Sequence, residues 1–441
     1  MADPARLAAY DVLRAVRVED AYANLALPDA LRSHRLSGRD AAFATELASG
    51  TLRRQGTYDA VVDACLTRGK VQPRVRDVLR LGVHQLLGMR VGTHAAVSAT
   101  VDLAKARGGP RSAGLVNAVL RTVAEYDLDT WVARVAPDAA TDPLGHLAVA
   151  HSHPRWVVEE LGRALGDRQG ELAELLAADN AAPGVVLVSR PGRSGPDELP
   201  GEPTSFSPYG VVLAGGDPAS VPAVAEGRAG VQDEGSQLVA VAVAEAVVEG
   251  EDHRWLDLCA GPGGKAALLA ALAAQRGATV VANEVQPHRA ALVQRALAGA
   301  DGVAGVTTYD GREPAWPAGS FDRVLVDAPC SGLGALRRRP EARWRKQPSH
   351  LTELVPLQEA LLTSALELVR PGGVVVYATC SPVVAETAEV VGRVVGGRDD
   401  TRLEPVPLDV PDAVGPLPGT VQLWPHRHGT DAMFVAVLRR G

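Results

Sequence analysis

LDLCAGPGGKA, residues 256–266, is the stretch that decides how the C-terminal half of the chain folds. Its apolar start predicts a strand, its glycines predict a tight turn, and the alanines that follow predict a helix. Glycine lets the backbone approach a ligand closely because it has no Cβ, and the first turn of a helix offers unpaired N–H groups. The stretch therefore predicts a strand–turn–helix unit with a ligand at its turn.

Strands and helices alternate on both sides of this unit. With the strand at Arg254–Cys259, seven strands are expected, and the last two would close the sheet with an antiparallel hairpin. Such alternation is typical of a mostly parallel sheet covered by helices on both faces, so residues 231–441 are expected to form an α/β Rossmann-like domain. The other expected strands are Ala278–Asn283, Val303–Thr308, Asp322–Asp327, Gly373–Thr379, Val421–Trp424 and Met433–Leu438.

The residues before this domain follow two other patterns. Residues 1–124 are expected to form an all-helical bundle, because apolar side chains such as Val78, Val83 and Leu87 recur at helical spacing. Residues 125–230 place prolines and glycines between short strands and helices, which predicts a small α+β connecting module. A chain of 441 residues is also too long for one ordinary core, so a multidomain protein is expected.

Charge and hydropathy restrict the possible partners. The net charge is −7, yet residues 1–124 hold 18 Lys and Arg against 11 Asp and Glu. If a polyanion such as RNA binds, this part and local basic patches are expected to hold it, and the alternative for its arginines is a solvated bundle surface. No apolar run reaches the ~18–20 residues of a membrane span. The N-terminal stretch carries acids and lacks the apolar core of a signal peptide. We expect a cytoplasmic protein without a membrane partner.

Acidic residues follow the next two expected strands. Glu284 ends the second strand, where a carboxylate can accept hydrogen bonds from ribose hydroxyls, and Asp310 follows the third, where it can reach an adenine amino group. Both suit an adenosine cofactor, and the glycine turn also satisfies the G-x-G-x-x-A spacing of an NAD-linked dehydrogenase. A hydride-transfer enzyme would need no pair of cysteines, so the residues downstream favour S-adenosylmethionine over NAD.

The chain has four cysteines that lie neither in C-x-x-C pairs nor near regularly spaced histidines: Cys65, Cys259, Cys330 and Cys380. Free thiols are therefore expected, with no disulfide framework and no metal site. Two of them follow the ends of expected strands, in DAPC (327–330) and TCS (379–381). Ligands of an open α/β sheet bind beyond the carboxyl ends of its strands, so neighbouring strands would bring both thiols into one pocket.

Two thiols and a carboxylate suit methyl transfer to cytosine. The C5 carbon is too weak a nucleophile to take a methyl group from a sulfonium unaided, but a thiolate that adds to C6 makes C5 enamine-like. A hydrogen bond at N3 would stabilise the developing charge, and a base must then remove the C5 proton. Cys380, Asp327 and Cys330 can supply these roles, although spacing alone does not distinguish the cysteines. Lys265 and the sulfonium could favour the thiolate, since a free thiol has a pKa of about 8.5.

Three motifs, LDLCAGPGGK, VDAPCSGLG and YATCSP, resemble those of the Sun/Fmu family of RNA 5-methylcytosine methyltransferases. The helical first domain resembles the NusB-type RNA-binding domain of the RsmB-like branch of this family. The resemblance extends from Arg6 to Arg440. It implies S-adenosylmethionine as the cofactor and a cytidine of small-subunit (16S) ribosomal RNA as the substrate, and we expect a monomer.

Carried over to this sequence, the resemblance makes Cys380 the nucleophile and lets Cys330 assist proton removal or product release. The opposite assignment stays open, because the proline before Cys330 also resembles the Pro-Cys nucleophile of DNA cytosine methyltransferases. A different class of function, an RNA-binding assembly factor with an inactive core, stays open as well. The residues that the resemblance implies for the cofactor are Cys259, Ala260, Gly261, Pro262, Gly263, Gly264, Lys265, Glu284, Asp310 and Asp327.

Two places depart from the family pattern. The chain has Arg190-Pro191 where the family often has an arginine–asparagine pair, and DAMF (431–434) where it often has Asp-Gly-Phe-Phe. The first departure bears on local RNA contacts and the second on a turn near the expected active site.

A basic segment follows the first of the two thiols. Its cations match RNA phosphates, and its indole can stack on a base drawn out of a helix. The residues predicted to contact RNA are Arg337, Arg338, Arg339, Arg343, Trp344, Arg345 and Lys346.

Overall fold

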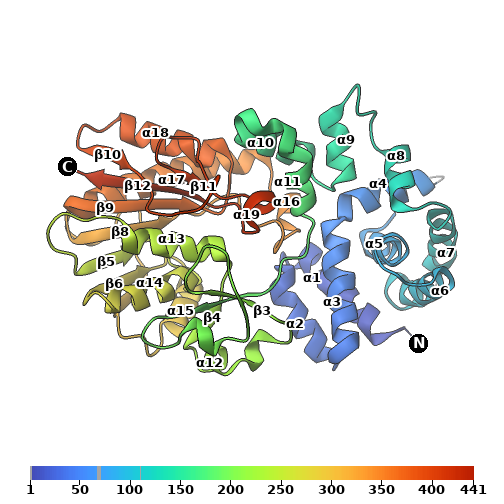
Figure 1. Cartoon of the computed structure of the whole chain (residues 1–441). Coiled ribbons are helices and arrows are strands. Elements are labelled where there is room, and N and C mark those ends of the chain that lie inside the picture. The colour runs from blue at the N-terminus through green and yellow to red at the C-terminus, as the bar shows by residue number, and fades with distance from the viewer. Residues whose placement is uncertain (1, 67–70, 110) are drawn as a thin grey trace. The chain divides into compact units, whose positions relative to one another are not determined.

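The computed structural model describes residues 2–66, 71–109 and 111–441, which form two compact units (Figure 1). The helical unit holds the chain up to Ala181 and the short segment Leu336–Arg345, and the sheet unit holds Ala182–Ala335 and Lys346–Gly441. These two units meet in the chain near residue 181, and the domain boundaries expected from the sequence, 124/125 and 230/231, stay a prediction. The expected connecting module is shared, because its first helices pack with the helical unit and its strands lie in the sheet unit.

Helices with apolar faces build the helical unit, as predicted for its first part. The first helix begins after Asp3, whose carboxylate accepts the N–H of Arg6 at 3.0 Å and caps the helix. Leu13, Leu47 and Leu79 are buried in the core between the helices. The helices are α1 (Pro4–Val18), α2 (Ala23–Ser33), α3 (Gly38–Arg53), α4 (Gln55–Cys65), α5 (Pro73–Leu87), α6 (Thr93–Leu103), α7 (Ser112–Val123), α8 (Leu128–Val135), α9 (Pro143–Ala150), α10 (Arg155–Leu165), α11 (Leu172–Ala178) and α16 (Ala342–Arg345).

The sheet unit is built on one large sheet, which has eight strands within the described residues. Its order is β10-β12-β9-β8-β5-β6-β7, with β11 beside β12. Neighbours from β7 to β9 are parallel, and β12 is antiparallel to β9, β10 and β11. The predicted, mostly parallel sheet with an antiparallel edge is confirmed. The strands are β5 (Arg254–Asp257), β6 (Thr279–Asn283), β7 (Val303–Thr307), β8 (Phe321–Asp327), β9 (Val369–Thr379), β10 (Thr401–Glu404), β11 (Val421–Gln422) and β12 (Phe434–Arg440).

Helices cover both faces of this sheet (Figure 1). Successive side chains of a strand point to opposite faces, so Leu325 packs with α13 and α14 while Val324 and Val326 pack with α17 and α18. No helix in the described ranges is both long and apolar enough to cross a membrane. The covering helices are α13 (Glu234–Glu245), α14 (Gly264–Ala274), α15 (Pro287–Ala296), α17 (Pro348–Leu368) and α18 (Ala388–Gly396).

A small antiparallel sheet in the order β2-β3-β1-β4 precedes the large one in the chain. Arg190, which begins the first departure from the family pattern, follows β1 and is buried. Its Nη1 donates to the carbonyls of Gly227, at 2.8 Å, and Ala296, at 3.3 Å, and burial lowers its pKa to about 10. Arg190 thus serves packing of the sheet unit. The strands are β1 (Val186–Ser189), β2 (Gly201–Pro203), β3 (Gly210–Leu213) and β4 (Ala229–Val231).

Candidate active site

The candidate site lies at the carboxyl ends of β5, β8 and β9. β8 lies between the other two strands, and Asp327 at its end is opposite Ala378 of β9. The prediction that the strands ending at Asp327 and Thr379 are neighbours is therefore confirmed. The loops that follow both strands start side by side, and these loops carry the two cysteines.

The turn after β5 needs its glycines because other side chains pack closely against the backbone there. A Cβ on Gly261 would lie 2.0 Å from Oε2 of Glu284, and a Cβ on Gly263 would lie 2.7 Å from the Cβ of Ala296. Gly263 also has a φ of 110°, which favours glycine, and caps α14 at its N-terminus. The turn therefore brings the backbone against the end of β6 and leaves the first N–H groups of α14 at the sheet edge.

Glu284 and Asp310 follow β6 and β7, but their surroundings differ. Glu284 is buried, its Oε1 accepts the N–H of Gln286 at 3.0 Å, and its Oε2 lies 3.3 Å from Nη1 of Arg289. Arg289 also donates to the Gly261 carbonyl at 2.7 Å, which ties the acid to the glycine turn. The side chain of Asp310 is 41% exposed and pairs with Arg312, whose hydrogen bonds lower the pKa of Asp310 to about 2.

Lys265 connects the glycine turn to the catalytic candidates. Its Nζ lies 2.9 Å from Oδ2 of Asp327 and 3.4 Å from Oγ of Ser236. Burial alone would lower the pKa of Lys265, but the negative charges at Asp327 and Cys380 raise it above its usual value. The site therefore holds an ammonium group beside the predicted N3 contact.

The two predicted thiols meet at this edge of the sheet, with Sγ of Cys330 and Sγ of Cys380 3.4 Å apart. The hydrogen bond between them, and the burial of the thiol, raise the pKa of Cys330. The same hydrogen bond lowers the pKa of Cys380, and Lys265 adds to that shift against the opposing effects of burial and Asp327. Cys380 is accordingly the thiol of the pair that ionises more readily.

The second departure from the family pattern lies against the Cys330 loop. The N–H of Ala432 donates to the Gly334 carbonyl, and the N–H of Gly334 donates to the Cys380 carbonyl, both at 2.9 Å. Asp431 is buried, and its N–H donates to Oδ1 of Asp233 at 3.0 Å. Backbone hydrogen bonds thus hold the turn in place, and none of these bonds needs the glycine that the family often has there.

Two buried carboxylates at the site have no counterpart in the sequence prediction. Asp257, the last residue of β5, is fully buried, and burial, followed by repulsion from Asp327, raises its pKa to about 8. Glu386 is also fully buried and accepts hydrogen bonds from the residues that follow both cysteines, Ser331 and Ser381. The detectable signals were an acid inside the apolar motif LDLC and an acid six residues after Cys380 in an apolar stretch.

The basic segment expected to bind RNA is partly internal to the helical unit. Arg343 is fully buried, and its guanidinium donates to Asn180 Oδ1 at 2.8 Å and to the carbonyls of Ser152 and Asp179 at 3.1 and 3.2 Å. Burial lowers its pKa to about 10. Such a side chain has no surface for a phosphate, so the prediction of an RNA contact at Arg343 does not fit the structure.

Trp344 and Arg345 are half-buried in the same unit. A Cβ on Gly56 would lie 2.4 Å from the Trp344 indole, so that ring packs on α4. The guanidinium of Arg345 pairs with Asp20 at 3.0 Å and lies 5.4 Å from the ring of Tyr22. Of the other predicted contacts, Arg337 is buried, Lys346 is half-buried, and Arg338 and Arg339 are exposed.

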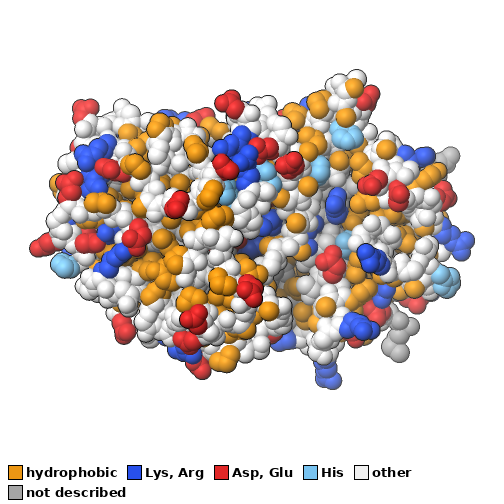
Figure 2. Space-filling view, in the orientation of Figure 1, with side chains coloured by type: hydrophobic (Ala, Val, Ile, Leu, Met, Phe, Trp, Pro, Cys, Tyr) orange, Lys and Arg blue, Asp and Glu red, His pale blue; other side chains and the backbone are white. Residues whose placement is uncertain are grey.

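The basic excess of the helical unit forms no single-sign patch on the face in Figure 2, where blue and red side chains are interspersed. Several of its arginines pair with acids. Arg17 lies 2.7 Å from Asp77, and Arg80 lies 2.6 Å from Asp59. This face of the unit therefore has a mixed charge pattern.

Comparison with known proteins agrees with this geometry. The family profile described as "16S rRNA methyltransferase RsmB/F" matches residues 245–439, and the profile described as "NusB family" matches residues 3–125. A Mycobacterium tuberculosis protein with a provisional methyltransferase name is 52% identical over 99% of this chain and 97% of its own. The "Ribosomal RNA small subunit methyltransferase B" of Pseudomonas syringae is 32% identical over 98% of this chain and 96% of its own.

Solved structures share the fold. The structure titled "Crystal Structure of PH0851" has a TM-score of 0.81 and 23% identity, and it covers 100% of this chain and 99% of its own. The structure of NSun6 from Pyrococcus horikoshii with SFG has a TM-score of 0.57 and 16% identity, and it covers 65% of this chain and 98% of its own.

Proposed function

The chain belongs to the RsmB/F family of 16S rRNA methyltransferases, and from this premise we propose that it methylates C5 of a cytidine in small-subunit ribosomal RNA. The methyl donor is S-adenosylmethionine. The observation that carries the C5 assignment is the thiol pair, 3.4 Å apart, beside Lys265 and Asp327. Methyl transfer to an oxygen or an exocyclic nitrogen would need no such pair, because those atoms have their own lone pairs.

The residues at the sheet edge fit this donor. Its adenosine suits the acids after β6 and β7, Glu284 and Asp310, and its amino-acid part suits the glycine turn and the first N–H groups of α14. When bound, it supplies the methyl group as a sulfonium. We assign cofactor binding to Cys259, Ala260, Gly261, Pro262, Gly263, Gly264, Lys265, Glu284, Asp310 and Asp327.

We assign the covalent step to Cys380. Its thiolate bonds to C6 of the cytosine, which moves electron density to C5. N3 takes a proton from solvent to balance the charge added to the ring, and the Asp327 carboxylate accepts the hydrogen bond from N3–H. Once Cys380 is bonded to carbon, it no longer accepts the hydrogen bond from Cys330. The methyl group passes to C5, and the Cys330 thiol gives its own proton to solvent. The Cys330 thiolate then takes the C5 proton, and the bond between C6 and Cys380 breaks, so that Cys380 leaves as a thiolate and the product is released. The polarity of the thiol pair supports this order of roles.

RNA contacts are proposed for the exposed end of the basic segment. Arg338 and Arg339 are exposed, and Lys346 is half-buried, so their charges can reach phosphates. The buried Arg343 is left out of this set. Replacing Arg338 and Arg339 by Ala should weaken RNA binding at low salt and flatten its salt dependence.

A methylation assay tests the proposal. The protein is incubated with labelled S-adenosylmethionine and with either deproteinised small-subunit RNA or partly assembled subunits, both from a strain that lacks the gene. The RNA is then digested to nucleosides, and 5-methylcytidine is the expected product. If neither substrate yields it, the proposal is wrong. Cys380→Ala should abolish the product, and Cys330→Ala should trap a covalent protein–RNA adduct; the reverse pattern would exchange the two roles.

A further inference from the structure

Glu386 lies behind the two thiols, in a 3₁₀ turn at Val384–Glu386 between the Cys380 loop and α18. Its side chain is fully buried, in a part of the site that the proposed chemistry does not use. A buried carboxylate is costly unless hydrogen bonds or opposite charges compensate it. Its partners therefore show what this side chain is for.

The partners of Glu386 come from both cysteine loops. Ser331, which follows Cys330, donates its N–H to Oε1 at 2.7 Å and its hydroxyl to Oε2 at 2.5 Å. Ser381, which follows Cys380, donates its hydroxyl to the same Oε2 at 2.6 Å. The two serine oxygens are 3.0 Å apart. One carboxylate thus joins the backbone of one cysteine loop to the side chain of the other.

Two further elements hold Glu386 in this position. Gln358 of α17 donates to Oε1 at 3.1 Å and to the carbonyl of Pro329 at 2.9 Å. Tyr377 of β9 donates its hydroxyl to the Glu386 carbonyl at 2.7 Å. Every group that faces the carboxylate oxygens is a donor, which is the arrangement that an ionised carboxylate accepts. The geometry therefore places a fixed negative charge next to the Cys330 loop.

The thiol pair has different charges on its two sides. Lys265, Asp327 and Asp431 act on Cys380, and Lys265 is the cation among them. Glu386 acts on Cys330 and raises its pKa, after the larger effects of the hydrogen bond to Cys380 and of burial. Cys380 therefore has one cation and two carboxylates around it, whereas Glu386 is the carboxylate that acts on Cys330. The charge of Glu386 favours a proton on Cys330 and, through the hydrogen bond between the thiols, a thiolate at Cys380.

We propose that Glu386 is a positioning residue that fastens the two cysteine loops together and makes Cys330 the thiol that keeps its proton when one thiol of the pair ionises. Its side chain is fully buried and has no surface for a ligand, so it acts through Ser331 and Ser381. The catalytic meaning of the pair rests on the proposed function, but the polarity of the pair can be measured without RNA or methyl donor. The two ideas can therefore fail separately.

Thiol alkylation tests the charge part. Glu386→Gln keeps the shape of the side chain and removes its charge, and Glu389→Gln, at an exposed carboxylate three residues on, is the matched control. Iodoacetamide reacts with thiolates, so the initial labelling rates of Cys330 and Cys380, measured by peptide mass spectrometry, report which one is ionised. We expect Cys380 to react faster in the unchanged protein and in the control. In Glu386→Gln the rate ratio of Cys330 to Cys380 should rise about tenfold, which corresponds to about one pKa unit.

Cys259, a third thiol of the same unit, reports whether the variant stays folded. If Cys259 labelling and the unfolding midpoint are unchanged and the ratio of Cys330 to Cys380 is also unchanged, the charge part is overturned. If Glu386→Gln does not fold, Glu386→Asp decides the same point, because the shorter side chain keeps its charge but withdraws it from the loops. The ratio should then rise by a smaller factor, and a constant ratio would overturn the charge part.

Ser381→Ala tests the fastening part. It removes one hydroxyl donor and leaves the carboxylate in place, so the loops should lose alignment while the charge asymmetry remains. We expect kcat of methylation to fall about tenfold with KM within twofold of the unchanged protein, and the labelling ratio to stay near its original value. A kcat equal to that of the unchanged protein would show that the serine–carboxylate contact does not position the thiols.

Discussion

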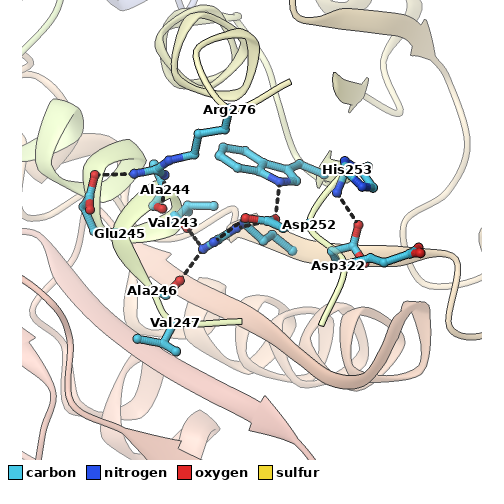
Figure 3. A network of polar contacts seen from close by, with 12 residues as sticks. Val243, Ala244, Glu245, Ala246, Val247, Asp252, His253, Arg276 and Asp322 are labelled. Atoms are coloured by element: carbon cyan, nitrogen blue, oxygen red, sulfur yellow. Dashed lines mark hydrogen bonds and ion pairs between the residues drawn. The ribbon is translucent and has the colours of Figure 1, made fainter. Parts of the chain in front are cut away.

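The charged residues at the two ends of β5 and β8 differ in how well their surroundings stabilise them. At the amino ends, Arg323 donates through Nη2 to Asp252 at 2.6 Å and through Nη1 to the Val243 carbonyl at 2.7 Å, and it lies 5.0 Å from the ring of Trp255. Figure 3 shows this network, in which Asp322 also accepts the N–H of His253 at 2.8 Å. Each charge here is matched by partners.

At the carboxyl ends of the same strands, the surroundings perturb the pKa values of several titratable groups. Asp257 has a pKa raised to about 8, whereas Arg323 lowers the pKa of Asp252 although burial opposes that shift. The two thiols are hydrogen-bonded to each other, and the half-buried Lys265 has a raised pKa. Functional sites are where such perturbed groups concentrate. The two strands are therefore stabilised by paired charges at their amino ends, and they carry the groups with perturbed pKa values at their carboxyl ends.

The largest expected effect is on stability and concerns Arg323, near the amino end of β8. Arg323→Met should lower the free energy of unfolding by about 3–5 kcal/mol, because it leaves Asp252 partly buried without its cation. Urea unfolding measures this change. Arg402→Met is the control, since Arg402 of β10 is exposed and pairs with Glu404, and it should stay within about 0.5 kcal/mol of the unchanged protein. Equal losses in both variants would mean that burial does not distinguish the two pairs.

The next largest effect is on the rate of methylation and concerns Lys265, which pairs with Asp327 at the carboxyl end of β8. Lys265→Met should lower kcat about 10²-fold, or roughly 2.7 kcal/mol, because it removes the cation that supports Asp327 and the Cys380 thiolate. Since Lys265 lowers the pKa of Cys380, the rate of the variant should peak at a higher pH. A pH profile of kcat in the methylation assay measures both changes. Lys105→Met, at an exposed ion pair with Asp102, should leave the profile unaltered.

The features that could be predicted from the sequence are those that depend on residues close together in the chain. The consecutive apolar residues Val324 to Val326 indicate a buried strand. The strand β10 was not predicted, because its sequence, TRLE, has charged residues and lies at the edge of the sheet. The glycine turn and both thiols follow strand ends, so their convergence follows from the parallel order. Arg343 and Glu386 could not be assigned, because their partners lie far away in sequence. Asn180 is 163 residues from Arg343, and Ser331 is 55 residues from Glu386.

A smaller effect concerns stability and pH at Asp257. Its pKa is raised to about 8 in the folded protein, so between pH 4 and pH 8 the unfolded chain ionises this acid while the folded protein keeps the proton. Stability therefore falls as pH rises through this window and levels off above pH 8. Asp257→Asn should remove that dependence, which amounts to about 2 kcal/mol between pH 6 and pH 7.5 at about 1.36 kcal/mol per pH unit. Urea unfolding across this range measures the dependence, and parallel curves for both proteins would contradict it.

The smallest expected effect separates structure from ligand binding at Asp310. The side chain of this acid is partly exposed and pairs with Arg312, so Asp310→Asn should alter the free energy of unfolding by less than about 0.5 kcal/mol at neutral pH. If the carboxylate reaches the adenine of the methyl donor, calorimetric titration should show affinity for S-adenosylmethionine falling about fivefold, or roughly 1 kcal/mol. Asp400→Asn, at another exposed acid paired with an arginine, should leave the affinity unchanged. Unchanged affinity in Asp310→Asn as well would remove Asp310 from the cofactor site and leave Glu284 as the acid that recognises adenosine.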